Sequence, residues 1–319
     1  MRSAVLLHLT SERVPSQLAV GRLTTVVPSE VLAMATVGEI LETVEHTPGC
    51  VGLLPVEDSF EGEDTAVLDR LVFETSGVFV CEEVVVSESL GAFRLRAETP
   101  EQLRTAVSHP RAIEHSHRFV REHGLATRFV GSIDEACKLV AESGDPTLVA
   151  LAPSDAAERA GLVPVATSVV DVPDARTRLF LVSQDVAEPT GRDKTTLVLT
   201  QPTDRSGSLV RYLQAFSAHD VNLVSLHSRP IARAAGSYCF LATAEAHVHD
   251  ATMRGAIEAL WEAGAHIKLL GSYPEWEGEQ VLAPFDVAPL ASVGPDSPDE
   301  ARSRLLRADG APAPAGSRT

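Results

Sequence analysis

Lysine is scarce in this chain of 319 residues and occurs only at Lys138, Lys194 and Lys268. The other 24 of the 27 basic residues are arginine, against 44 acidic residues, and the formal net charge at pH 7 is −17. A chain this acidic lacks the broad basic surface with which proteins bind DNA, RNA or anionic membranes. The balance does not exclude an anionic small-molecule substrate, because such a ligand needs only one or two local arginines.

Cysteine is also rare, and the four cysteines do not group. Cys50, Cys81, Cys137 and Cys239 are far apart and form no Cys-x-x-Cys pair. In a chain of this length, that spacing argues against a disulfide framework and a zinc ribbon. We expect four buried free thiols in a reducing compartment.

Long apolar runs are absent as well. No stretch approaches the ~18 apolar residues of a membrane-spanning helix, and the opening run is too short for a secretory signal, so we expect a cytoplasmic protein. Gly-x-Ser-x-Gly, Gly-x-Gly-x-x-Gly and P-loop motifs are missing, which leaves serine hydrolases, dinucleotide binding and NTP binding without support. The His-x-His pairs at 115–117 and 247–249 lack a third ligand, so we expect no metal.

The first 183 residues alternate short apolar runs with amphipathic segments. The runs predict strands at 4–9, 51–56, 77–86, 147–152 and 178–183. The segments between them predict helices at 39–46, 100–108, 112–123, 133–143 and 154–161. Strands that alternate with helices are typical of an α/β layered architecture.

The second block is more regular. Strand patterns at 194–201, 221–228, 237–245 and 266–273 enclose two amphipathic helical patterns at 206–220 and 250–265. The order βαββαβ predicts a ferredoxin-like domain at 194–280. The polar residues 184–193 have the composition of a linker, and the Pro- and Ala-rich residues 288–319 that of a mostly disordered tail.

Two segments of this block carry chemistry. A glycine at a strand-to-helix turn, here Gly207, lets a ligand approach backbone N–H groups, and a helix N-terminus favours a carboxylate. Together with His227–Pro230, this turn resembles the Gly-Ala-Leu-Val and Glu-Ser-Arg-Pro motifs of the ACT regulatory domain of prephenate dehydratases. The resemblance implies binding of phenylalanine or another aromatic amino acid. The matching residues are Gly207, Ser208, Leu209, Val210, His227, Ser228, Arg229 and Pro230.

His227 replaces the acidic residue of that second motif. Because histidine changes charge near neutral pH, we expect phenylalanine binding that is weaker or pH-dependent.

The first block resembles the same family. Residues 52–62 are similar to its Val-Pro-Ile-Glu-Asn-Ser-x-x-Gly segment, 108–113 to Ser-His-Pro-Gln-Ala-Leu, and 175–179 to Thr-Arg-Phe. The resemblance covers about residues 4–280. It implies a two-lobed, periplasmic-binding-protein-like catalytic domain at 1–183. One lobe would comprise about 1–75 plus 166–183, and the other about 76–165.

Prephenate dehydratase removes carbon dioxide and the ring hydroxyl of prephenate together and forms phenylpyruvate. The resemblance makes Thr177 the catalytic hydrogen-bond donor to the leaving hydroxyl. It implies no metal or organic cofactor. The expected substrate-binding residues are Arg178, Arg176, Ser59, Asp58, Ser108 and His115.

The chain departs from the family at several of these positions. The family's Gly-Pro-x-Gly-Thr loop is replaced by residues 7–13, which contain no glycine. Asp58 stands for an asparagine, His115 for a glutamine and Leu179 for a phenylalanine. A carboxylate at position 58 repels a dicarboxylate substrate unless it is protonated or paired.

Three functions therefore stay open: a prephenate dehydratase of phenylalanine biosynthesis with aromatic amino acid feedback, a non-aromatising prephenate decarboxylase of a specialised pathway, and a catalytically silent regulator. The retention of Thr177 argues against the decarboxylase. ACT domains generally bind ligand at shared interfaces, so we expect a homodimer or homotetramer.

Overall fold

The computed structural model describes residues 2–10, 13–59, 62–87, 89–96, 102–172, 175–201, 207–231 and 238–281. They belong to one compact unit, Met1–Leu282. The tail expected at 288–319 lies outside the described residues. Within those residues, no helix is long and apolar enough to cross a membrane.

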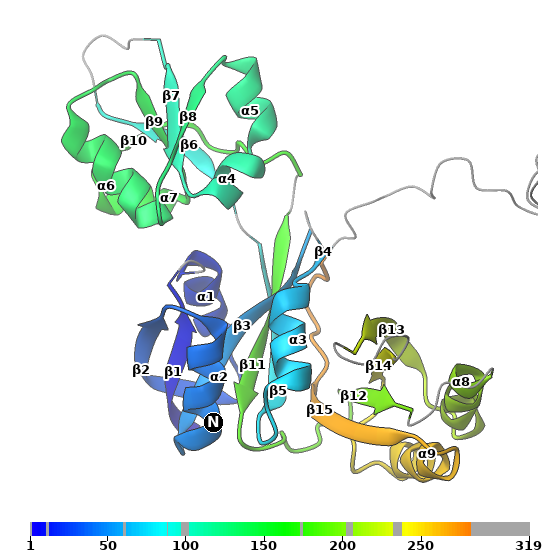
Figure 1. Ribbon diagram of the computed structural model, residues 1–319. Coiled ribbons are helices and arrows are strands. Elements are labelled where there is room, and N and C mark those ends of the chain that lie inside the picture. Colours follow the sequence, from blue (N-terminus) through cyan, green and yellow to red (C-terminus); the bar gives the residue numbers. More distant parts are fainter. Residues whose placement is uncertain are drawn as a thin grey trace, which may run out of the picture. The chain divides into compact units, whose positions relative to one another are not determined.

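The first lobe is built on one end of a ten-stranded sheet (Figure 1). β1 pairs in parallel with β2 and β3, while β11 lies antiparallel between β3 and β5. β3 and β5 are buried over nearly their whole length, which explains why most of their residues are apolar; β5 also buries Glu82 and Glu83. The strands are β1 (Arg2–Leu9), β2 (Val26–Met34), β3 (Cys50–Asp58), β4 (Gly62–Glu63), β5 (Phe79–Ser87) and β11 (Arg176–Ser183), and the helices are α1 (Arg13–Val20), α2 (Val37–His46) and α3 (Thr65–Phe73).

The second lobe has its own five-stranded sheet, in the order β10-β6-β9-β7-β8. The crossing from the first lobe falls after Ser87, later than the boundary expected near residue 76, because β5 pairs with β11 in the first sheet. Its strands are β6 (Gly91–Arg94), β7 (Thr105–Ser108), β8 (Ala126–Phe129), β9 (Leu148–Ala152) and β10 (Val163–Ala166), and its helices are α4 (Pro110–Glu114), α5 (His117–Glu122), α6 (Ile133–Ser143) and α7 (Ser154–Arg159).

One predicted helix is wrong. Residues 105–108 of the segment 100–108 form β7, which is hydrogen-bonded between β8 and β9. The β-branched Thr105 and Val107 favour this strand, and burial in a parallel sheet outweighs the helical pattern.

The predicted ferredoxin-like domain is confirmed. Four strands pair antiparallel in the order β13-β14-β12-β15, and α8 and α9 pack on one face through a separate apolar cluster. Alternation decides the faces: Leu197 and Leu199 contact the helices, whereas Val198 points the other way. Its elements are β12 (Asp193–Thr200), α8 (Ser208–Ala218), β13 (Leu223–Pro230), β14 (Tyr238–Ala244), α9 (Ala251–Glu262) and β15 (His266–Pro274).

The other face of this domain shares a core with the first lobe. Val198, Leu241 and Leu270 belong to the same apolar cluster as Leu68 and Leu71 of α3. The first lobe and the ferredoxin-like domain therefore bury apolar surface against each other, which stabilises their joint arrangement.

Lys268 on β15 adds a polar contact to this junction. Its Nζ donates hydrogen bonds to the carbonyl oxygens of Leu71, Val72 and Thr75, at 2.8, 2.7 and 2.5 Å. These oxygens lie at the C-terminal end of α3, where carbonyls lack intrahelical donors and a cation is favoured. Burial lowers the pKa of Lys268.

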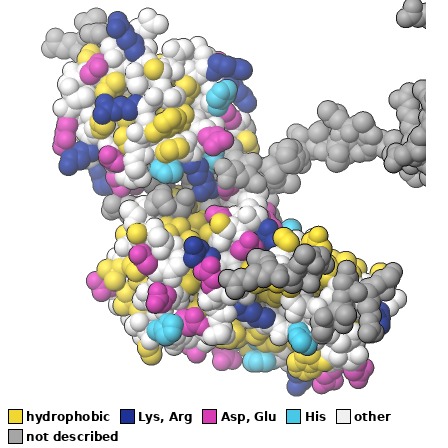
Figure 2. Space-filling model, viewed as in Figure 1, with side chains coloured by type: hydrophobic (Ala, Val, Ile, Leu, Met, Phe, Trp, Pro, Cys, Tyr) yellow, Lys and Arg dark blue, Asp and Glu magenta, His cyan; other side chains and the backbone are white. Residues whose placement is uncertain are grey.

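The surface of the described residues carries mixed charge. Figure 2 shows acidic and basic side chains interspersed over the face in view, without a broad basic patch among the residues that are coloured by type.

Gly271 marks a close backbone approach at the junction. β15 runs parallel to β5 and pairs with it at a single register position, Gly271 opposite Val80. A Cβ at position 271 would lie 2.2 Å from the carbonyl oxygen of Val80, so only glycine allows this pairing.

We expect Gly271→Ala to lower the free energy of unfolding by about 1–3 kcal/mol, because the clash is with backbone that cannot move independently. Urea denaturation measures the change. Gly21→Ala is the matched control, since a Cβ there would lie 3.8 Å from its nearest neighbour. Equal stability of the two variants would contradict the close approach.

Candidate active site

The end of β3 and the start of β11 hold each other in register. Asp58 lies opposite Thr177 in the antiparallel pair. Next to it, the Ser59 N–H donates to the Arg176 carbonyl at 3.0 Å, and the Arg176 N–H donates to Ser59 Oγ at 3.1 Å. The Ser59 hydroxyl therefore fixes the backbone of this corner.

Thr177 lies at the centre of this corner and is 4% exposed. It is flanked by Asp58 on β3 and by Val86 on β5. Side chains directly opposite each other share one face of a sheet, so Thr177 and Asp58 point the same way. A hydroxyl and a carboxylate thus meet in a site from which most water is excluded.

Arg111 of α4 joins the same group. Its Nη2 forms an ion pair with Oδ2 of Asp58, whose side chain is 8% exposed, against 26% for that of Arg111. Local sequence places the arginine: Pro110 begins α4, and the His109 side chain accepts a hydrogen bond from the Arg111 N–H. The carboxylate at position 58 is therefore paired rather than exposed to an anionic substrate.

Arg111 was not among the site residues expected from the sequence. Arg111 occupies the place of the glutamine within the family's Ser-His-Pro-Gln-Ala-Leu segment, and Asp58 occupies the place of an asparagine. Two neutral amides are thus replaced by one charge of each sign. This paired change was the signal that could have predicted the contact.

His115 and Ser108 are buried beside α4. The pKa of His115 is lowered to about 4, chiefly because burial disfavours the charged ring and also because Arg111 lies nearby, while Asp58 opposes the shift. His115 is therefore neutral at pH 7. The Ser108 hydroxyl donates to the carbonyl of Leu151 at 2.7 Å and connects β7 to β9.

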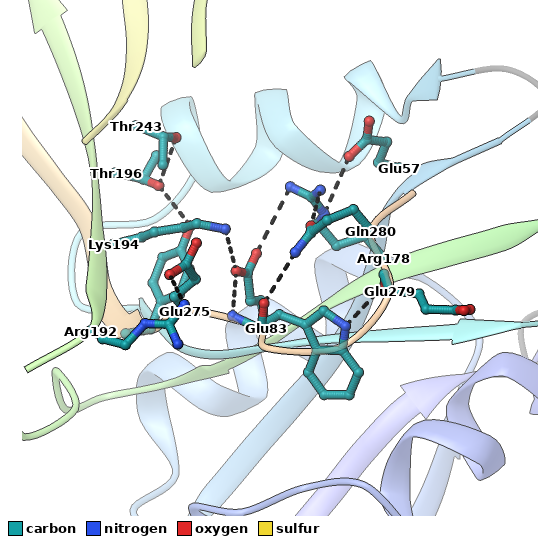
Figure 3. Close-up of polar contacts among 12 residues, drawn as sticks. Glu57, Glu83, Arg178, Arg192, Lys194, Thr196, Thr243, Glu275, Glu279 and Gln280 are labelled. Atoms are coloured by element: carbon teal, nitrogen blue, oxygen red, sulfur yellow. Dashed lines mark hydrogen bonds and ion pairs between the residues drawn. The ribbon is translucent and has the colours of Figure 1, made fainter. Parts of the chain in front are cut away.

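Arg176 and Arg178 lie on the opposite face of β11 from Thr177, as strand alternation requires. Arg176 Nη2 lies 2.5 Å from Glu279. Arg178 Nε lies 3.3 Å from Glu57, and its Nη2 donates to Gln280 Oε1 at 3.3 Å (Figure 3). The structure thus places both arginines against the segment that follows β15 and does not bring them to the Thr177 group.

The expected effector residues divide between α8 and β13. Gly207 is the N-cap of α8 with φ +83°, Ser208 is buried, Leu209 is partly buried and Val210 is exposed. On β13, Ser228 and Pro230 are exposed.

The two other motif residues of β13 face the first lobe. His227 Nδ1 lies 3.2 Å from Glu63 Oε2. Arg229 Nη2 lies 3.5 Å from the same oxygen, and its Nε lies 3.7 Å from Asp69. This half of the motif therefore contacts β4 and α3.

No group of three His, Cys, Asp or Glu side chains suited to a metal ion occurs within the described ranges. The second His-x-His pair has structural contacts: His247 Nε2 lies 3.0 Å from the Ala187 carbonyl, and its Nδ1 accepts from the His249 N–H.

Known proteins resemble this chain over its two lobes and its ferredoxin-like domain. A family model described as prephenate dehydratase matches residues 16–187, more than half of the chain and the whole Asp58–Arg111–Thr177 group. The bifunctional chorismate mutase/prephenate dehydratase of Neisseria gonorrhoeae is 31% identical over 76% of this chain and 67% of its own length. The prephenate dehydratase of Amycolatopsis methanolica is 30% identical over 78% of this chain and 82% of its own.

A solved structure extends the likeness through the ferredoxin-like domain. The prephenate dehydratase of Arthrobacter aurescens in complex with L-Phe aligns with a TM-score of 0.74 at 25% identity, and the alignment covers 95% of this chain and 97% of that one. The predicted α/β architecture is thereby confirmed. On the motifs, the family model and these relatives, the chain belongs to the prephenate dehydratase family of carbon–oxygen lyases.

Proposed function

We propose that this chain converts prephenate to phenylpyruvate, with Thr177 as the hydrogen-bond donor to the departing ring hydroxyl. In this reaction the bond to the ring carboxylate breaks and carbon dioxide departs, the electron pair of that bond completes the aromatic ring, and the hydroxyl leaves and takes up a proton from solvent to become water. The position of buried Thr177 beside a neutralised Asp58 carries the proposal. A donor held in a water-poor site lowers the barrier to loss of a poor leaving group.

Arg111 neutralises Asp58, which otherwise would repel a substrate with two carboxylates. It lies on the Thr177 side of the site, whereas Arg176 and Arg178 contact Glu279 and Glu57 on the other face of β11.

Regulation is proposed for the ferredoxin-like domain, which we infer to be an ACT domain joined by residues 184–193 to a catalytic domain at 1–183. The Arthrobacter aurescens relative in complex with L-Phe supports an aromatic amino acid effector. The candidate binding residues are Gly207–Val210 and His227–Pro230.

Exposed apolar side chains lie on β13 and β14, at one end of the ten-stranded sheet. β13 is the terminal strand of the ten-stranded sheet, and Val224, Leu226 and Tyr238 on β13 and β14 are between 37% and 47% exposed. An exposed apolar edge strand is an interaction surface, which supports a homodimer or homotetramer. We place the protein in the cytoplasm, as its biosynthetic reaction suggests.

Incubation with prephenate at neutral pH, followed by product identification by ultraviolet absorbance and mass, tests the function. Phenylpyruvate formed above the spontaneous rate supports the dehydratase. A decarboxylated, non-aromatic product would assign the decarboxylase instead. No product from folded protein that binds an aromatic amino acid would assign the silent regulator.

Thr177→Ala is expected to lower kcat by about 10²–10⁴-fold, because it removes the donor to the leaving hydroxyl. Thr177→Ser keeps a hydroxyl and is expected to retain more activity than the alanine variant. Steady-state kinetics on prephenate give both values. Thr75→Ala is a matched control, since Thr75 is another buried threonine whose hydroxyl bonds the Leu71 carbonyl. Full activity of Thr177→Ala would refute the role.

Arg111→Gln leaves Asp58 as an uncompensated carboxylate, and we expect KM for prephenate to rise at least tenfold. The double variant Asp58→Asn/Arg111→Gln restores a neutral pair and is expected to recover most of that loss. A double-mutant cycle in kcat/KM measures the coupling. Additive effects of the two substitutions would show that the ion pair does not matter for substrate binding.

His115 is expected to make stability fall in acid. Its folded pKa of about 4 lies below its ordinary value of 6.5, so between these values the unfolded chain binds a proton that the folded chain does not. The free energy of unfolding therefore decreases as pH drops from 6.5 towards 4. Urea denaturation at several pH values should show a shallower decrease for His115→Gln, with exposed His46→Gln as control. Parallel curves for wild type and His115→Gln would contradict the assignment.

A further inference from the structure

Two stretches of chain join the first lobe to the second, and both leave the first sheet at the same place. β5 ends at Ser87, β11 begins at Arg176, and these two residues are paired in register. Among the described residues, the two lobes have separate apolar clusters and share none. Arg176 therefore lies at the base of the hinge between the lobes, one residue before Thr177.

The segment Glu275–Gln280, which follows β15, holds Arg176 at this point. Arg176 Nη1 donates to the carbonyl oxygen of Gln280 at 3.1 Å, and its Nη2 lies 2.5 Å from Oε2 of Glu279. Gln280 also accepts a hydrogen bond through Oε1 from Arg178 Nη2 at 3.3 Å (Figure 3). Two consecutive residues of this segment thus contact both arginines of β11.

The same segment is itself fixed in a compact turn. The indole N–H of Trp276 donates to the carbonyl oxygen of Glu279, and Gln280 Nε2 donates to the carbonyl oxygen of Trp276, both at 3.1 Å. A Cβ on Gly278 would lie 2.6 Å from the indole ring, so the ring covers this glycine. The Trp276 N–H donates to Glu83 Oε1 of β5 at 2.9 Å. Because these contacts already order the segment, holding the arginines costs little further conformational entropy.

Arg176 depends on these acceptors, because its side chain is only 10% exposed. Guanidinium N–H groups that lose their acceptors in a buried place cost free energy unless the side chain moves to reach water. Such a movement would displace the β11 backbone at the residue directly before Thr177. The contacts made by the segment therefore affect the direction in which the Thr177 hydroxyl points.

We propose that Glu279 and Gln280 are positioning residues for the dehydration reaction. By holding Arg176 and Arg178 on one face of β11, they fix the direction of the Thr177 hydroxyl on the other face and limit motion of the hinge. This inference rests on the proposed function. A misplacement of about 1 Å at a reacting group can cost about 10²-fold in rate, so a segment on the far face of β11 can still govern kcat.

The double variant Glu279→Ala/Gln280→Ala tests the proposal through the steady-state kinetics of the full chain on prephenate. We expect kcat to fall about tenfold and KM to stay within about twofold, because the groups that bind the substrate remain in place. Both side chains are exposed, so the substitutions remove no core packing, and thermal unfolding checks that the variant is folded. Glu277→Ala is the matched control, since it removes an exposed ion pair between the same segment and Arg192, and its kcat should equal that of wild type.

The fluorescence of Trp276 gives a second measurement that does not depend on turnover. The chain has two tryptophans, so Trp261→Phe leaves Trp276 as the only indole. In that background, Glu279→Ala/Gln280→Ala should make acrylamide quench Trp276 more strongly, because the hydrogen bond from the Gln280 side chain to the Trp276 carbonyl is lost and the segment separates from β11. Glu277→Ala should leave the quenching unchanged.

A wild-type kcat in the double variant, or an equal loss in Glu277→Ala, would overturn the positioning role. A rise in KM without loss of kcat would do the same, since it would assign the segment to substrate binding. Unchanged quenching would also overturn it, because the segment would then be held without these two side chains. Phenylpyruvate formation by wild type is assayed first, so failure of the proposed function is recognised separately from failure of this inference.

Discussion

The insertion of β11 between β3 and β5 is the constraint on which the rest of the structure depends. It brings residues more than a hundred positions apart into register, with Thr177 opposite Asp58 and the Ser59 hydroxyl bonded to the Arg176 N–H. Because side chains alternate between the two faces of β11, Thr177 lies on one face and Arg176 and Arg178 lie on the other. The hydroxyl faces the candidate active site, and both arginines face the segment that follows β15.

This alternation explains how the short segment 176–178 contributes both to the candidate active site and to the contacts with the ferredoxin-like domain. Arg178 contacts Glu57, Glu83 and Gln280, and Glu83 in turn contacts Lys194 of the ferredoxin-like domain. The shared apolar core around Leu71 and Leu241 makes these polar contacts part of a packed interface. A change in the ferredoxin-like domain therefore reaches β11 through two or three side chains in direct contact.

The sequence predicted the ferredoxin-like domain well, because apolar residues recur with a period of about two in its strands and about 3.6 in its helices. It did not predict β7, since Thr105–Ser108 is too short to show a strand pattern and lies within an amphipathic window. It also missed the edge strand β2, where exposed Val31 and Leu32 break the alternation on which such predictions depend.

The motifs predicted which residues belong to the site, but they did not predict which way the side chains point. Thr177, Asp58 and Ser59 follow from local resemblance, and register brings them together. Arg178 was expected at the substrate because arginine binds carboxylates, but which face of a strand it occupies depends on the pairing of the whole sheet. Arg111 could not be predicted in this way, because its contact with Asp58 joins two lobes whose residues are far apart in the sequence.

The three lysines differ in what surrounds their amines. Lys194 and Lys268 sit at the junction between the first lobe and the ferredoxin-like domain, where one ammonium meets Glu83 and the other three carbonyl oxygens. A tetrahedral ammonium suits three converging oxygens in a way that a planar guanidinium does not. The side chain of Lys138, on α6, is 72% exposed. An amine-directed acylating reagent applied to the folded chain therefore meets one accessible lysine, and acylation of the other two would report that the junction has opened.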